Sequence, residues 1–424
     1  MIKLGLKVNL RIVNYNIKFE KQGEGKTYNN IKSTNTLGIR YPTIQDLREH
    51  ARYRIPRFAF DYVDGAAGAN EVGMARNAQA LDLVELVPRY GLENYKPDIE
   101  TNLFGRLYSA PIAIAPMGMP GMVWPGGEEI FAKASHKARI PFTLSTAAGA
   151  TIERITELAP ETTWFQLYRM PHNNLEMNFD LVKRAKTAGV HVLILTLDVP
   201  ARTKRPRELR NQLTIPYKPG LHTLIDVLPH PGWILALAKH GHNSFANYKK
   251  YTDNKLSGYE LAKFARQRSG GTFSWKEVSQ LRDVWPGPLV VKGILHPNDA
   301  EKAISVGVDG VVVSNHGGRQ LEGAPATVDV LPAIANAIGK EATILFDSGI
   351  RSGLDVVRVM ALGAKAALSG RAFMYGLGAL GAKGADHVVN YYTEEISAAM
   401  RQIGVHDIQE CSDIMIRHEN ALKF

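Results

Sequence analysis

The feature that most constrains the fold is a unit that repeats from about residue 110 onward. Each unit is a short apolar, β-branched run that ends in a glycine-rich or polar turn and is followed by a helical pattern. The eight runs are Pro111–Gly118, Phe142–Gly149, Trp164–Met170, Val192–Pro200, Pro288–Leu295, Gly310–Gly318, Thr343–Ile350 and Ala366–Phe373. Continuous hydrophobic strands that alternate with helices indicate a parallel sheet whose outer face is covered.

Eight such units in about 265 residues match a (β/α)8 barrel, for which about 250 residues are typical. We therefore predict an α/β protein built on a single (β/α)8 TIM barrel. The competing architecture is an open, doubly wound sheet. The sequence favours it less, because no G-x-G-x-x-G motif follows the first strand.

The barrel domain is expected at residues 41–418, between a flexible basic extension at 1–40 and a C-terminal tail at 419–424. Thr43 is a candidate cap for the first helix of this domain. Of the net charge of +10, +6 belongs to residues 1–40, so the body of the protein is nearly balanced. This distribution argues against nucleic acid as a partner.

The single cysteine, Cys411, rules out an internal disulfide and a thiolate metal cluster. This cysteine usage indicates a reducing compartment, and we expect a cytoplasmic protein without a metal site.

One connection is abnormally long. Residues 201–287 separate the fourth and fifth predicted strands, far more than a usual loop and helix. This insertion contains an apolar segment, Leu228–His240, with a tryptophan and basic neighbours. A lid, an oligomer contact and a membrane-surface anchor are each compatible with such a segment.

In a TIM barrel the chemistry is carried at the carboxyl ends of the strands. The sequence places its unusual polar residues there. They are Gln166, Tyr168, Thr196, Asp198, Lys292, Ser314, His316, Asp347 and Arg371.

Two of the predicted turns have the composition of a phosphate site. The seventh strand ends in Asp347–Gly353 and the eighth in Ser369–Arg371, where small residues allow backbone N–H groups to approach a ligand. Arg371 adds a fork of donors for phosphate oxygens.

Lys292 lies inside the apolar run Leu289–Gly293, where an ammonium group is costly unless it is paired or functional. Three interpretations remain open. Lys292 extends to water at the barrel rim, forms a Schiff base as in an aldolase, or stabilises the anionic ring of a reduced flavin.

His316 follows the sixth strand, and two glycines separate it from Arg319. A histidine at a strand end can act as a general base near neutral pH, and the arginine can bind a carboxylate with two donors. Asp198 ends the fourth strand, where its carboxylate would raise the pKa of a neighbouring imidazole and orient its tautomer. One arginine of the basic loop Arg202–Arg207 would suffice as a second carboxylate clamp.

The run Ser314–Leu321 (SNHGGRQL) resembles the signature of the FMN-dependent 2-hydroxy-acid oxidases and dehydrogenases. The other motifs follow in that family's order over about residues 41–418. The resemblance implies that His316 is the catalytic base and that Asp198 is its partner.

The resemblance also implies how the substrate is bound. Tyr62 would hydrogen-bond the substrate carboxylate, which Arg205 and Arg319 would clamp, and Tyr168 would steady the substrate oxygen.

The implied cofactor is FMN. By resemblance, the flavin ring would meet a backbone turn and a set of polar side chains, and the ribityl phosphate would lie near the last two strands. The residues implied in cofactor binding are Pro116, Met117, Gly118, Ser145, Gln166, Thr196, Lys292, Ser314, Asp347, Gly349, Arg351, Gly370 and Arg371.

Two features indicate which members of the family this chain resembles most. Ala147 stands where glycolate oxidase has a tryptophan, which indicates a wider pocket and a substrate such as lactate or mandelate. The segment His230–Trp233 resembles the membrane-associated lactate and mandelate dehydrogenases. The resemblance implies a homotetramer with a peripheral contact through residues 221–254 to the inner face of the cell membrane.

The expected activity is oxidation of a small (S)-2-hydroxy acid to the 2-oxo acid, with electrons passed to a quinone or cytochrome acceptor. One alternative is an oxidase that uses oxygen and produces hydrogen peroxide. Two further alternatives are a non-redox lyase or isomerase on the same barrel, and a non-catalytic flavoprotein.

Overall fold

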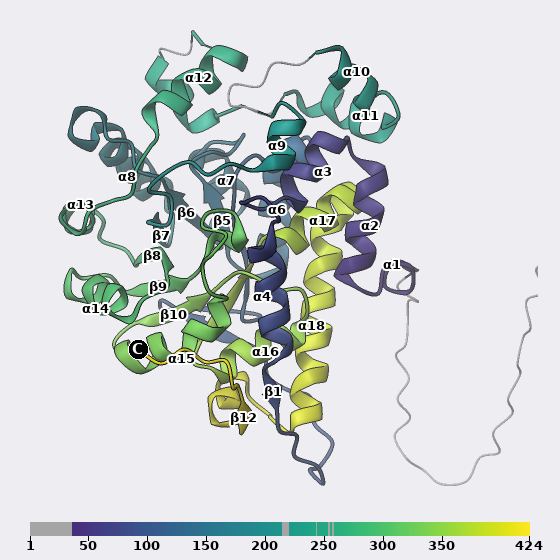
Figure 1. The fold of residues 1–424 in the computed structure, drawn as a ribbon, viewed down its shortest axis with the longest axis vertical. Helices are drawn as coiled ribbons and strands as arrows, with labels where there is room; N and C mark the ends of the chain where they lie inside the picture. The colour runs from purple at the N-terminus through teal and green to yellow at the C-terminus, as the bar shows by residue number, and fades with distance from the viewer. Residues whose placement is uncertain (1–35, 214–219, 243, 253–254, 257) are drawn as a thin grey trace, which may run out of the picture.

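A computed structural model describes residues 36–213, 220–242, 244–252, 255–256 and 258–424. Eight parallel strands form a closed barrel, in which each strand pairs with the next along the chain and the last with the first (Figure 1). They are β4 (Ile112–Met117), β5 (Phe142–Ser145), β6 (Thr163–Leu167), β7 (Leu193–Thr196), β8 (Leu289–Ile294), β9 (Gly310–Val313), β10 (Thr343–Phe346) and β11 (Ala366–Ser369). Seven of them lie within the predicted runs, and β6 begins one residue before its run, at Thr163, so the TIM-barrel prediction is confirmed.

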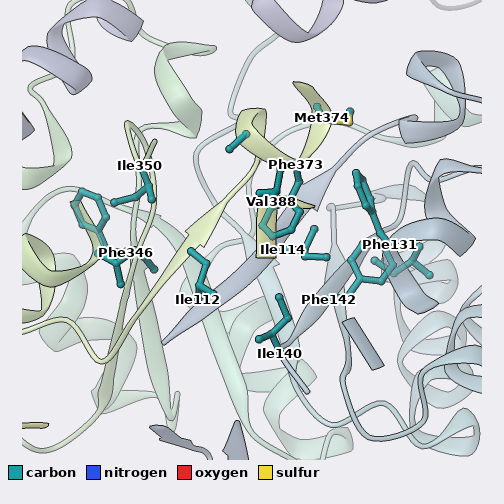
Figure 2. Close-up of a cluster of buried hydrophobic side chains, with 14 of the residues drawn as sticks. Ile112, Ile114, Phe131, Ile140, Phe142, Phe346, Ile350, Phe373, Met374 and Val388 are labelled. Atoms are coloured by element: carbon teal, nitrogen blue, oxygen red, sulfur yellow. The ribbon is translucent and has the colours of Figure 1, made fainter. Parts of the chain in front are cut away.

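Burial of the strands on both faces explains their continuous hydrophobicity. In β7, Leu193 and Leu195 pack outward against the helices, whereas Ile194 joins the core inside the barrel. The outer core includes Ile112, Ile114, Phe142 and Phe346, with side chains from the surrounding helices packed onto them (Figure 2). Alternation along each strand therefore fills two apolar layers.

Helices surround the barrel. Those that follow the strands are α6 (Gly127–Ala138), α7 (Ile152–Leu158), α8 (Glu176–Ala188), α13 (Trp275–Val284), α14 (Pro297–Ser305), α15 (Thr327–Ile338), α16 (Gly353–Ala361), α17 (Arg371–Leu380) and α18 (Gly384–Ile403). Short elements complete this layer: α5 (Pro120–Val123), η1 (His172–Leu175), η3 (His316–Gly318), η4 (Gly381–Lys383) and η5 (Ile408–Asp413).

Four helices precede the barrel: α1 (Thr36–Arg40), α2 (Ile44–Arg54), α3 (Arg57–Asp64) and α4 (Val72–Asp82). Thr43 caps α2, as predicted, and forms a capping box with Asp46. Residues 1–35 of the predicted extension lie outside the described residues.

Short strands occupy the end of the barrel opposite the pocket described below. The hairpin of β2 (Thr101–Leu103) and β3 (Arg106–Tyr108) packs against the barrel interior, where Trp164 donates a hydrogen bond to Tyr108. Two further strands, β1 (Glu85–Leu86) and β12 (Ile416–Arg417), pair with each other. In the C-terminal tail, the backbone N–H of Leu422 donates to the carbonyl of Asp329 in α15.

The insertion after β7 folds into α9 (Pro206–Arg210), α10 (Leu221–Val227), α11 (Pro231–His240), η2 (Ala246–Thr252) and α12 (Gly258–Arg268). Figure 1 shows α9 to α12 together at the top of the molecule. The last helix of the predicted range, α13, packs beside α8 and belongs to the barrel layer. Among the described residues, none of the helices combines the length and the hydrophobicity that a membrane-spanning helix requires.

Candidate active site

A pocket opens at the carboxyl ends of the barrel strands, and most of the predicted site residues line it. These are Tyr62, Pro116, Met117, Gly118, Tyr168, Arg205, Lys292, His316, Arg319, Asp347, Gly349, Arg351, Gly370 and Arg371. The other predicted residues lie beside or beneath the lining: Ser145, Gln166, Thr196, Asp198 and Ser314. The barrel therefore brings together residues from position 62 to position 371.

His316 and Asp198 form a hydrogen-bonded pair, with 2.9 Å between His316 Nδ1 and Asp198 Oδ1. His316 has a left-handed backbone, with φ of 59°. Asp198 fits behind it because residue 293 is glycine: a Cβ atom on Gly293 would lie 2.5 Å from the Cβ of Asp198. The glycine is thus required for the approach of the carboxylate.

The pKa of His316 shifts in the direction opposite to the one predicted from the sequence. Asp198 acts to raise the pKa of His316, as predicted, but burial outweighs it and Lys292 acts in the same sense as burial, so the pKa is lowered. Burial also disfavours the charge on Asp198, yet His316 and Lys292 prevail and lower the pKa of that carboxyl. The resting arrangement is an ionised carboxylate beside a neutral imidazole, as a general base requires.

Lys292 is buried and paired. Its Nζ lies 3.1 Å from Asp347 Oδ2 and 3.8 Å from Asp198 Oδ2, and donates to Ser314 Oγ at 2.8 Å. Burial opposes its charge, but the carboxylates of Asp347 and Asp198 outweigh burial and raise its pKa. Lys292 is therefore a fixed buried cation rather than a side chain that extends to bulk water.

Three buried polar side chains link the ends of β5, β6 and β7. Ser145 Oγ donates to Gln166 Oε1 at 2.7 Å, and Gln166 Nε2 donates to Thr196 Oγ1 at 2.9 Å. The strand register places Ser145 beside Gln166 and Thr196 beside Lys292. This series of hydrogen-bonded side chains extends from β5 to the strand position beside Lys292 on β8.

Tyr62 and Tyr168 contribute phenol groups to the pocket. Tyr62 Oη donates to the carbonyl of Gly118 at 2.8 Å, and burial raises its pKa. Burial, with Asp198 adding to it, raises the pKa of Tyr168 to about 12. Both phenols are held in the protonated form and remain hydrogen-bond donors near neutral pH.

Arg319 and Arg205 contact each other in the lining of the pocket. Arg319 Nη1 donates to the backbone carbonyls of Tyr62 and Gly65 at 2.8 and 2.9 Å, and its guanidinium carbon lies 5.1 Å from the centroid of the Tyr62 ring. Arg205 Nε donates to the carbonyl of Arg319 at 3.2 Å. Both arginines also donate to Glu208.

Arg371 lines the same pocket and lies near Arg319, since both donate to the carbonyl of Gly65. Its Nε, Nη1 and Nη2 donate to the backbone carbonyls of Val63, Gly317 and Gly65, respectively, at 2.8–2.9 Å. Burial lowers its pKa to about 9, and the nearby cations Arg319 and Arg351 act in the same direction. Among the described residues no carboxylate forms an ion pair with Arg371. A cation placed in this way favours an anionic ligand such as phosphate.

Several lining residues were not predicted from the sequence: Met119, Glu208, Leu213, Phe245 and Met374. Leu213 and Phe245 come from the insertion and are almost fully buried. Only Glu208 left a signal in the sequence, as an acid three residues after Arg205 at helical spacing. The insertion thus supplies both a charged group and an apolar wall to the pocket.

The chain is similar in sequence to known enzymes. A family model described as FMN-dependent dehydrogenase matches residues 51–418. An L-lactate dehydrogenase of Pseudomonas syringae is 37% identical over 366 residues, 86% of this chain and 95% of that enzyme. An L-lactate dehydrogenase of Acinetobacter baylyi is 36% identical over 378 residues, covering 89% and 97% of the two chains.

Solved structures with the same architecture are also similar. The crystal structure of the monotopic membrane protein (S)-mandelate dehydrogenase matches with a TM-score of 0.83 and 35% identity, over 89% of this chain and 99% of that one. A mandelate oxidase matches with a TM-score of 0.76 and 31% identity, over 89% of this chain and 98% of the other.

Proposed function

The chain belongs to the FMN-dependent dehydrogenases that oxidise 2-hydroxy acids, and we propose that its substrate is a small (S)-2-hydroxy acid, lactate or larger, whose electrons pass to a quinone or cytochrome. The observation that carries the proposal is the hydrogen bond between His316 and Asp198, in one pocket with two arginines. A base next to a carboxylate clamp fits a substrate that carries its reacting hydroxyl beside a carboxylate.

Residues in and beside the lining of the pocket fit the cofactor. Arg371, without an acid partner among the described residues, and Arg351 beside it would hold the phosphate. Lys292 is a buried cation suited to a polar, charge-accepting ring edge, and Gln166 and Thr196 offer amide and hydroxyl groups nearby. Bound FMN supplies the two-electron acceptor for the reaction.

The chain's own residues bind the substrate and move a proton. Arg205 and Arg319 hold the carboxylate, and the Tyr62 hydroxyl becomes a further donor when its proton turns from the Gly118 carbonyl to the substrate. Because Nδ1 of His316 is engaged by Asp198, Nε2 is the nitrogen that takes the proton. As His316 becomes charged, the carboxylate of Asp198 stabilises the imidazolium.

The substrate's side chain would lie against the apolar part of the pocket. Ala147 is small, and Met119, Leu213 and Phe245 provide apolar surface in the same pocket. This wall suits a methyl or phenyl substituent, as in lactate or mandelate, which are substrates in the names of the related enzymes.

The test is anaerobic reduction of the purified, FMN-loaded protein. We expect (S)-lactate or (S)-mandelate to bleach the flavin absorbance faster than glycolate, and the (R)-enantiomers to leave it unchanged. Reoxidation by a quinone analogue is expected to outpace reoxidation by air. Faster reoxidation by air, with hydrogen peroxide formed, would make the protein an oxidase. A flavin that no 2-hydroxy acid reduces would reject the proposal.

The non-redox alternative makes Lys292 a Schiff-base nucleophile. The raised pKa keeps this amine protonated, which disfavours attack on a carbonyl. Treatment with borohydride and a keto acid is expected to leave Lys292 unmodified, and covalent trapping at that residue would support the alternative.

We further propose that α10 and α11 contact the membrane surface. Leu221, Leu224, Ile225 and Leu228 in and after α10 are 56–74% exposed, and Leu235 in α11 is 71% exposed. Contiguous apolar exposure of this kind marks an interaction surface.

The helix pair is anchored to the body of the protein. Trp233 is buried, its Nε1 donates to the carbonyl of Met122 at 3.2 Å, and its ring meets Phe58 edge to face. Asp226 accepts from the backbone N–H groups of Arg57 and Phe58 at 3.1 and 3.2 Å. The exposed apolar side chains therefore belong to a helix pair that is itself fixed to the body of the protein.

Flotation with anionic phosphatidylglycerol vesicles tests this contact. The protein is expected to float with the vesicles and Leu224→Glu to stay in solution, whereas Leu83→Glu behaves like the wild type. Leu83 is the matched control for Leu224, because each of the two leucines is 56% exposed. Equal flotation of both variants would remove α10 from the contact.

A further inference from the structure

Glu208 joins the two arginines of the proposed clamp. Its Oε1 accepts from Arg319 Nη2 at 2.6 Å and from Arg205 Nη1 at 3.3 Å. The side chain is 17% exposed and lines the pocket. One carboxylate oxygen therefore holds both guanidinium groups at the place where the substrate carboxylate is proposed to bind.

The short helix that carries Glu208 is fixed to the body of the protein. Arg207 Nη1 donates to Asp64 Oδ2 at 2.6 Å, and Arg207 Nη2 lies 2.6 Å from Glu71 Oε2. Asn211 Nδ2 donates to Asp61 Oδ2 at 2.7 Å. Contacts on both sides of Glu208 thus set its place independently of the arginines that it holds.

One further anion would balance the charges of the clamp. Arg205 and Arg319 bring two positive charges, and Glu208 cancels one of them. Of the nearby cations, Lys292 is already flanked by Asp347 and Asp198. Arg371, which shares the Gly65 carbonyl with Arg319, is the cation proposed above to hold the cofactor phosphate. The clamp therefore keeps one net positive charge, the complement of one carboxylate.

We propose that Glu208 is a positioning and specificity-determining residue, which holds Arg205 and Arg319 in place and, by cancelling one of their charges, restricts the site to 2-hydroxy acids with a single carboxylate. The inference rests on the proposed function, since it assumes that these arginines bind the substrate carboxylate. It adds a selection by charge to the selection by size that Ala147 and the apolar wall make.

Binding of non-reacting anions tests the charge selection without turnover. Butyrate and succinate have the same carbon number and differ in one carboxylate, and their dissociation constants follow from the change in the absorbance spectrum of the bound FMN. The wild type is expected to prefer butyrate. Glu208→Gln keeps an oxygen acceptor for the arginines but removes the charge, and should shift the preference toward succinate by about five-fold or more.

Two more variants separate positioning from charge. Glu208→Ala removes the acceptor, and should weaken butyrate binding about ten-fold while the limiting rate of flavin reduction by (S)-2-hydroxybutyrate changes less. Glu208→Asp keeps the charge and should keep the wild-type preference for butyrate even if its binding weakens. Glu277→Gln is the matched control, because Glu277 is 18% exposed and pairs with Arg169 outside the pocket.

An unchanged butyrate-to-succinate ratio in Glu208→Gln, with full FMN content, would overturn the proposal. Equally tight binding of succinate and butyrate by the wild type would also overturn the proposal. This measurement requires no variant. A wild type that shows the expected ratio but is not reduced by any 2-hydroxy acid would reject the proposed function and leave the charge selection standing.

Discussion

His316 Nδ1 lies 2.9 Å from Asp198 Oδ1, although 118 residues separate the two along the chain. Three consecutive residues, His316, Gly317 and Gly318, adopt positive φ to make this approach. A Cβ atom on Gly318 would lie 2.6 Å from the backbone nitrogen of Met74, so the turn is packed from behind. The backbone thus fixes one ring nitrogen on the carboxylate and leaves the other for the substrate.

Replacing Asp198 by Asn removes the charge that stabilises the protonated imidazole. We expect the rate of flavin reduction to fall by about 100-fold or more, within the usual range for acid–base catalysis. Rapid-mixing absorbance under anaerobic conditions measures this rate. FMN content is the control, and a loss of less than about five-fold would show that Asp198 does not assist the base.

The pH dependence follows from the lowered pKa of His316. The base must be neutral, so kcat/KM should stay high above its pKa and fall as the pH drops through it, with the acid limb below about 6.5. Because Asp198 acts to raise that pKa, the limb should move to still lower pH in Asp198→Asn. An acid limb above pH 7 in the wild type would contradict this assignment.

Replacing Gly118 by Ala tests the place of Tyr62. A Cβ atom on Gly118 would lie 3.0 Å from the Tyr62 hydroxyl, which donates to the Gly118 carbonyl. We expect displacement of the phenol and an increase in KM of about ten-fold, the equivalent of one hydrogen bond to a charged group. Gly270→Ala is the control, since nothing lies within 4 Å of that position. Equal KM values for the two variants would remove Tyr62 from substrate binding.

Replacing Ala147 by Trp tests the size of the pocket. Ala147 lines the pocket, 3.8 Å from the position of a Cβ atom on Gly118. A bulky indole there should abolish activity on mandelate, reduce activity on lactate and spare glycolate. The measurement is the ratio of kcat/KM values for the three acids, and an unchanged ratio would show that the substrate's side chain lies elsewhere.

Replacing Lys292 by Met removes a buried cation from between two carboxylates. Asp347 and Asp198 would be left without their shared partner, which should lower the free energy of unfolding by about 3–5 kcal/mol. Thermal unfolding of the FMN-free proteins measures this loss directly. Lys292→Arg keeps the charge and should recover part of the stability, whereas equal midpoints for wild type and Lys292→Met would show that the lysine is not needed to balance the acids.

Much of the fold could be predicted because it depends on patterns of residues that are close together in the sequence. Strands buried on both faces are continuous apolar runs, and the cap at Thr43 needs only Asp46 three residues later. The predicted base, its acid partner and the buried lysine come from strand ends, and a closed barrel necessarily gathers strand ends at one opening. Topology alone therefore brought His316, Asp198 and Lys292 together.

The contribution of the insertion could not be predicted in this way. Glu208 meets Arg319 across 111 residues, and the contact depends on how α9 is held against α3 rather than on a repeat. Leu213 and Phe245 enter the pocket from segments without periodicity. The sign of the pKa shift of His316 was also out of reach, because burial outweighs the neighbouring carboxylate and burial is a property of the folded chain.

The most direct test of the central claim is anaerobic reduction of the bound FMN in His316→Ala by the best substrate of the wild type. The variant should bind FMN as the wild type does and be reduced by dithionite, yet be reduced by the 2-hydroxy acid at least about 100-fold more slowly. Reduction by substrate within about ten-fold of the wild-type rate would contradict the role of His316 as the base.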